Sequence, residues 1–249
     1  MIGNWRALRF PARSGGTARR PAAPVTYALI ALCSALFLVS PAAGLNPAYG
    51  TGEELVAAQR AYFHRWGVVP AQLFEGAPRS ALTPLTALFV HGSWVHLLGN
   101  MLFLYVFGAM TEERIGRIRF TLFYLGCGCL ALLGYAVAND GSTQSLVGAS
   151  GAVSGVLGAF LFLFPGARVT SLLPFLLFLP LRFPAWVVLP FWAGVQWVAA
   201  TRAGQGTGVA YLAHVVGFGL GFGCAWVCSG RPTRVKPAPA PAPEGENQP

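Results

Sequence analysis

Residues 148–164 read GASGAVSGVLGAFLFLF, a run of small residues that leads directly into a strongly apolar stretch. Small residues four apart, such as Gly148 with Ala152 and Gly151 with Gly155, let two helices approach closely inside a membrane. Ser150 lies in this run, where its hydroxyl serves either helix packing or chemistry. The run alone does not distinguish a packing role for Ser150 from a chemical one.

The composition is typical of a membrane protein. Charged residues make up 10% of the 249 residues and hydrophobic residues 55%, whereas soluble domains carry roughly 25% charged residues. The net charge of +9 comes from arginines that interrupt apolar runs instead of covering one polar face, so nucleic acid is not an expected partner. We therefore predict an all-α polytopic protein in a lipid bilayer.

A hydrocarbon core about 30 Å thick needs about 20 apolar residues in a helix, and six runs of that size predict a six-helix bundle. They cover residues 25–44, 92–110, 120–138, 146–165, 184–200 and 209–229. The apolar run 169–180 is short and interrupted by prolines, so we expect it to lie at the interface or to re-enter the membrane. A seventh span is the competing count.

The basic residues predict the orientation and the domain limits. Six spans with both termini cytoplasmic place thirteen of the 17 basic residues inside, in agreement with the positive-inside rule. We expect a basic cytoplasmic arm (1–24), a six-span domain (25–229) with a long external segment (about 45–90), and a disordered proline-rich cytoplasmic tail (230–249). Residues 53–66 of the external segment predict an amphipathic helix. A bacterial inner membrane fits this charge pattern.

Polar side chains inside a span are costly, so each is a candidate functional residue. The candidates are His91, His96, Asn100, Glu112, Ser150 and His214. In the sixth run, Ala213, Gly217 and Gly221 repeat the four-residue spacing of the fourth, which predicts that these two helices touch. Ser150 and His214 would then meet just below the external face.

A serine beside a histidine is a plausible hydrolase site, because a neutral imidazole can take the hydroxyl proton. No carboxylate is placed to complete a triad, because Glu112 and Glu113 lie at the cytoplasmic end and Asp140 in a short external loop, and this favours a dyad without a third acid. His96 and Asn100 share one helical face and, with the Ser150 backbone N–H, would donate to an oxyanion. A metal or haem protein and a transporter are rival classes; no carboxylate or thiolate joins the histidines, and no two equivalent halves are visible.

Four motifs, in this order, resemble the rhomboid family of intramembrane serine proteases over roughly residues 80–228. They are HGSWVHLLGNMLFLYVFG (91–108), TEERIGRIRF (111–120), VGASGAVSGVLGA (147–159) and AHVVGFGLG (213–221). The resemblance implies a six-transmembrane-helix rhomboid-like bundle that cleaves transmembrane segments of membrane proteins, with no metal or cofactor. The alternative is an inactive rhomboid-like chaperone or escort, which would usually lack the serine or the histidine.

The resemblance also assigns roles to single residues. Ser150 matches the nucleophile, His214 the base, and His96 with Asn100 the oxyanion-stabilising pair. The positions with a structural role are His91, Glu112, Arg114, Gly116, Gly148, Gly151, Gly217 and Gly221.

The sequence departs from the family at three places. Leu82 and Thr83 stand where many members have Trp-Arg, and Ser154 stands where an aromatic residue is common beneath the base. We therefore expect His214 to stack on Tyr211 or on another aromatic side chain. The stretch 166–184 resembles an enlarged cytoplasmic connection found in a bacterial subgroup.

Overall fold

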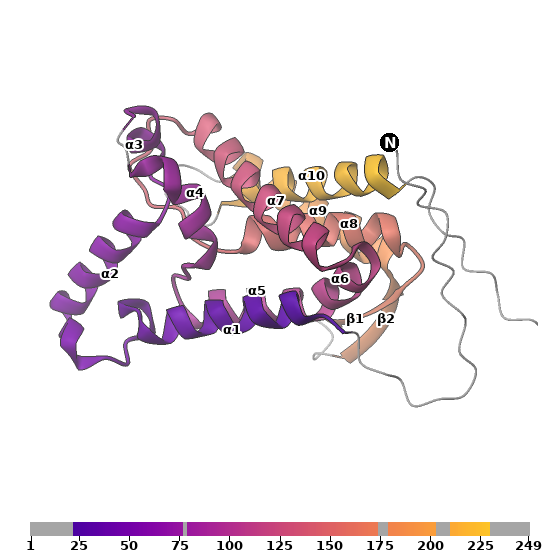
Figure 1. The fold of residues 1–249 in the computed structure, drawn as a ribbon, viewed down its shortest axis with the longest axis horizontal. Coiled ribbons are helices and arrows are strands. Elements are labelled where there is room, and N and C mark those ends of the chain that lie inside the picture. Colours follow the sequence, from indigo (N-terminus) through magenta and orange to yellow (C-terminus); the bar gives the residue numbers. More distant parts are fainter. Residues whose placement is uncertain (1–21, 77–78, 174–178, 203–209, 230–249) are drawn as a thin grey trace, which may run out of the picture.

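The computed structural model describes residues 22–76, 79–173, 179–202 and 210–229, which are mostly helical (Figure 1). Nearly all of the predicted basic arm and the whole predicted tail lie outside these residues. A helix is present at each of the six predicted runs. They are α1 (Pro24–Val39), α5 (Trp94–Phe103) continued by α6 (Ala109–Ile115), α7 (Arg117–Ala138), α8 (Ser150–Leu163), α9 (Ala185–Arg202) and α10 (Tyr211–Ser229).

Three of the described helices are long and apolar enough to cross a membrane, namely Trp94–Ile115, Arg117–Ala138 and Tyr211–Cys228. The apolar helices α1 and α8 are shorter, with 16 and 14 residues. The chain is thus a polytopic helical protein by length and composition, and the count of six spans stays a prediction.

The second predicted helix is longer than expected and contains an irregularity. A π-helical turn (Leu104–Gly108) joins α5 to α6, so the helix runs from Trp94 to Ile115 instead of ending near residue 110. Ser93 caps its start by accepting a hydrogen bond from the His96 N–H. Gly116 ends it with a φ of 87°, a conformation that is favourable only for glycine. The chain then turns directly into α7.

Helix α8 is the central element of the bundle. Every residue from 151 to 160 is buried, as expected for a helix that is apolar on all sides. Its small residues let α7 and α10 pack against it directly. The fold therefore places the start of α8, where Ser150 lies, among several neighbouring helices.

The segment predicted to be external forms short helices at one end of the bundle (Figure 1). They are α2 (Glu53–Trp66), α3 (Pro70–Phe74) and α4 (Thr83–Thr86), with 3-10 turns at Pro41–Ala43, Pro47–Tyr49, Ser80–Leu82 and Ala87–Phe89. The bounds of α2 agree with the helix predicted over 53–66. A β-bridge between Val68 and Leu146 ties this segment to the loop before α8. This backbone pairing braces the segment although Trp-Arg is missing at 82 and 83.

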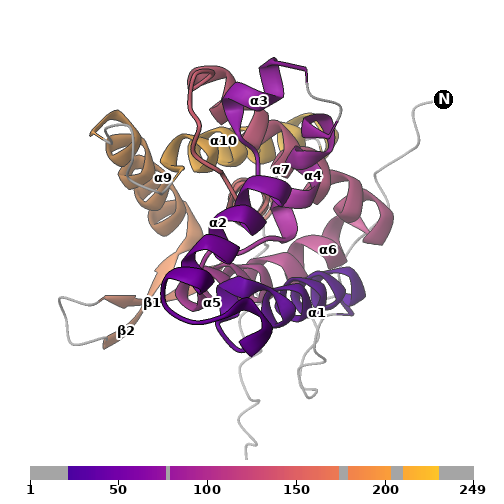
Figure 2. The same ribbon diagram turned by 90° about the vertical axis from the view of Figure 1, so that its left-hand side faces the viewer.

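The stretch 168–184 departs from the all-α prediction. It contains two antiparallel strands, β1 (Arg168–Leu173) and β2 (Leu179–Pro184), with Arg168 opposite Pro184. The apolar run was expected to lie flat or re-enter the membrane, and periodicity alone does not distinguish short apolar strands from such segments. The hairpin lies at the end of the bundle opposite α2 and leads directly into α9 (Figures 1 and 2).

Candidate active site

Ser150 is the first residue of α8, directly after a strained turn. Gly148 has a φ of 127°, and its N–H donates to the Ala87 carbonyl oxygen at 2.9 Å. The first N–H groups of a helix have no partner within the helix, and the helix dipole favours negative charge there. The backbone around Ser150 thus offers donors at the position where an oxyanion would form.

Helices α8 and α10 meet through glycines, as the spacing of small residues predicted. A Cβ added to Gly217 would overlap the carbonyl oxygen of Gly151, and one added to Gly221 would overlap that of Gly155. Backbone therefore lies against backbone along this contact. The contact holds the start of α10, with His214, beside the start of α8, with Ser150.

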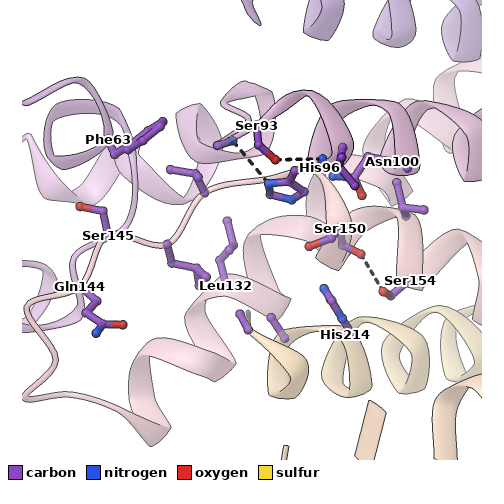
Figure 3. Close-up of a pocket in the computed structure, with 18 of the residues that line it drawn as sticks. Phe63, Ser93, His96, Asn100, Leu132, Gln144, Ser145, Ser150, Ser154 and His214 are labelled. Carbon is purple, nitrogen blue, oxygen red and sulfur yellow. Dashed lines mark hydrogen bonds between the residues drawn. The ribbon is translucent and has the colours of Figure 1, made fainter. Parts of the chain in front are cut away.

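His214 points from α10 toward Ser150 (Figure 3), and both residues line one cavity of about 980 Å³. Among the described residues, no hydrogen bond joins the Ser150 hydroxyl to the imidazole. The Nδ1 atom of His214 lies 2.8 Å from Oε1 of Gln196, an amide, whereas Asp140 accepts from the Gly141 N–H in its own loop.

His96 and Asn100 line the same cavity from α5. The Gly92 N–H donates to Nδ1 of His96 at 3.4 Å, so in this arrangement Nε2 carries the ring proton. A Cβ built on Gly148 would lie 2.6 Å from Nε2, so this edge of the ring faces the turn before Ser150. Only glycine leaves the imidazole room to lie there.

Asn100 is the second candidate side-chain donor. It is 7% exposed, and its Nδ2 atom has no hydrogen-bond partner among the described residues. An unpaired buried amide N–H is costly, and unpaired polar groups in native structures call for an explanation. An oxyanion formed in the cavity would supply the missing acceptor.

His91 does not line the cavity. It is 1% exposed and packs edge-on against His96, with ring centroids 5.3 Å apart. This position suits the structural role that the resemblance implied, because the His91 ring supports the side chain that faces Gly148.

Glu112 joins the end of the second predicted span to the start of the first. Its carboxylate accepts from the backbone N–H groups of Val25 at 3.0 Å and Thr26 at 2.7 Å. These belong to the first turn of α1, which has no capping side chain of its own. Arg114 lies in the last turn of α6, where a cation is favourable. The motif thus fixes α1 against α6.

Two residues near the candidate base were missed at the sequence level. Gln196 bonds to His214, and Trp192 stacks on its ring with centroids 6.1 Å apart and planes inclined by 28°. Tyr211, the aromatic named in the expectation, meets the ring edge-on at 88°. Gln196 is a polar residue in a predicted span, and that was the signal that could have identified it.

Fold and cavity together define a polytopic helical membrane protein with a cavity at one end of its bundle, where polar side chains lie among mostly apolar ones. The rhomboid domain matches residues 78–231, well over half of the chain, and the chain therefore belongs to the rhomboid family.

Curated relatives carry related names. Rhomboid protein 1, mitochondrial, of Saccharomyces cerevisiae is 35% identical over 155 residues, which cover 60% of this chain and 42% of the yeast protein. The putative rhomboid protease YdcA of Bacillus subtilis is 35% identical over 83 residues, 32% of this chain and 39% of that protein. Rhomboid-like protein 11, chloroplastic, of Arabidopsis thaliana is 42% identical over 73 residues, 29% and 25% respectively. The matched segments thus cover less than half of each relative.

Proposed function

We propose that the chain is an intramembrane serine endopeptidase that cleaves transmembrane segments of membrane proteins near the external face. One observation carries the proposal: Ser150, His214, His96 and Asn100, which come from three helices, line one cavity. Membership of the rhomboid family supports the same activity. In this proposal both termini are cytoplasmic, and a bacterial inner membrane is the expected location.

The first chemical step uses Ser150 and His214. The imidazole takes the hydroxyl proton while Oγ attacks the scissile carbonyl. The backbone N–H of Ser150, Nε2–H of His96 and Nδ2–H of Asn100 then donate to the oxyanion. His214 next protonates the leaving amine, and water hydrolyses the acyl-enzyme.

The substrate must lose helical structure before it can react. A peptide bond within a helix is shielded, and its freed backbone groups need partners inside lipid. The polar groups of the cavity provide such partners. We expect the substrate helix to approach laterally, between the second and fifth predicted spans, and to unwind at the starts of α5, α8 and α10.

The test is cleavage of a single-span reporter by purified protein in proteoliposomes. Ser150→Ala and His214→Ala should each lower the cleavage rate more than about 10³-fold. Ser145→Ala, which changes a serine in the wall of the same cavity, should cleave at the wild-type rate. Cleavage by either dyad variant at a normal rate would refute the proposal. A wild-type protein that binds the reporter without cutting it would favour the chaperone or escort alternative.

A further inference from the structure

The imidazole of His214 has a hydrogen-bond partner on α9. Gln196 of α9 places Oε1 at 2.8 Å from Nδ1. An amide oxygen only accepts hydrogen bonds, so in this arrangement Nδ1 carries the proton and donates it. The lone pair is then left on Nε2, and this tautomer is the one in which the other nitrogen acts as a base.

Trp192 holds the plane of the same ring. It lies four residues before Gln196, hence on the same face of α9, and it lines the cavity. Its ring is nearly parallel to the imidazole, and it also packs on Phe218, one turn after His214 along α10, with centroids 6.1 Å apart. The Trp192 ring thus restrains the tilt of the imidazole plane, and the Gln196 hydrogen bond restrains the rotation of the ring.

Helix α8 provides no such support beneath the base. Ser154, four residues after Ser150, donates its hydroxyl to the Ser150 carbonyl oxygen at 2.6 Å and is 2% exposed. Its side chain is short and already paired within its own helix.

We propose that Gln196 and Trp192 are positioning residues for the base: Gln196 selects the His214 tautomer, and Trp192 replaces the aromatic support absent at position 154. The inference rests on the proposed function, because it assigns partners to that function's base. Both residues act through His214, and Gln196 is not among the residues that line the cavity. The alternative is that the Gln196–His214 hydrogen bond only satisfies two polar groups inside the bundle. In that case, replacing Gln196 by an apolar residue would leave kcat unchanged.

The decisive variants change the acceptor at position 196. Gln196→Leu removes it, and Gln196→Glu keeps an acceptor oxygen at a similar volume. The leucine variant should lose at least about tenfold in kcat at unchanged KM, and the glutamate variant should retain most of the wild-type kcat. Gln196→Met is a second apolar replacement in case leucine impairs folding, which thermal unfolding in detergent would reveal.

A matched pair tests the ring contact. Trp192→Leu should lower kcat several-fold. Trp197→Leu, on the same helix at a position 56% exposed, should leave kcat unchanged. Equal kcat values in the two variants would overturn the role of Trp192.

The ring nitrogens of His214 report on the proposal independently of cleavage. In ¹⁵N spectra of the wild-type protein, recorded at a pH where the His214 imidazole is neutral, Nδ1 should be the protonated nitrogen. The Gln196→Leu variant should give a mixture of the two tautomers. A wild-type Nδ1 without a proton would overturn the assignment, as would a leucine variant with kcat within threefold of wild type. If the wild type cleaves no reporter but shows the Nδ1–H tautomer, the proposed function fails while the Gln196 contact stands.

Discussion

Helix α10 contacts α8 and α9 in different ways. Toward α8, its backbone at Gly217 and Gly221 lies directly against the backbone of Gly151 and Gly155. Toward α9, the hydrogen bond and the ring stacking of His214 are made with side chains, those of Gln196 and Trp192. The first contact has no room for an added atom, whereas the second can be altered one group at a time. Disrupting the first should therefore abolish the site, and altering the second should tune it.

The largest effect is expected where backbone meets backbone. Gly217→Ala places a methyl group on the Gly151 carbonyl and must separate the two helices, so cleavage should be lost and stability should fall by about 1–3 kcal/mol or more. Gly219→Ala is the matched control on the same helix, because nothing lies within 4 Å of its added Cβ. That control should be as stable as wild type or gain up to about 1 kcal/mol in helix propensity. Thermal unfolding and reporter cleavage measure both variants, and an active, stable Gly217→Ala protein would contradict the close contact.

The next largest effect is expected at Asn100, the candidate donor that lines the cavity from α5. Asn100→Ala removes a buried amide that has no other partner, so kcat should fall by about 10²–10³-fold with little change in KM. Leu98→Ala, at a position of α5 that is 60% exposed, should not change kcat. Steady-state kinetics on the reporter decide the matter; a kcat within threefold of wild type would remove Asn100 from the proposed oxyanion site.

An intermediate effect is expected at a contact that joins a side chain to backbone. Glu112→Ala leaves the N–H groups of Val25 and Thr26 without their acceptor, at about 1–3 kcal/mol for the buried Thr26 group and less for the part-buried Val25 group. The thermal midpoint should fall, while the kcat of the molecules that remain folded should stay close to wild type. An unchanged midpoint would show that water or another group caps α1.

The smallest effect is expected at Ser154. Ser154→Ala removes one hydroxyl bonded within its own helix, so stability should change by no more than about 1 kcal/mol and kcat by less than about threefold. A much larger loss of kcat, measured beside Trp192→Leu, would mean that α8 and not α9 supports the base.

The sequence was sufficient where a physical constraint acts along a single element. Apolar runs of membrane length located six helices, the spacing of Gly217 and Gly221 identified the contact with α8, and amphipathic patterning located α2. The sequence was insufficient where two residues that contact each other belong to different helices or strands. The Gln196 contact depends on how α9 is rotated relative to α10, and the pairing of β1 with β2 depends on backbone register. Neither is encoded in the periodicity of one segment.

The same reasoning separates the residues of the site. His96, Asn100, Ser150 and His214 are polar groups in apolar surroundings, so their cost in lipid marks them individually. Gln196 is also a polar residue in a predicted span, but the rest of the run 184–200 indicated a membrane span and no site. Trp192 carries no such mark, because a tryptophan in a membrane helix is ordinary, and only the structure shows its ring against His214.

The proposed function requires Ser150 to be a nucleophile that His214 activates. A fluorophosphonate reagent applied to the protein in membranes, followed by peptide mapping, tests this directly and without a known substrate. We expect one adduct, on Ser150, that forms at least about 10²-fold more slowly in His214→Ala. An adduct on another cavity serine such as Ser93 or Ser145, or labelling of Ser150 at the wild-type rate in His214→Ala, would contradict it.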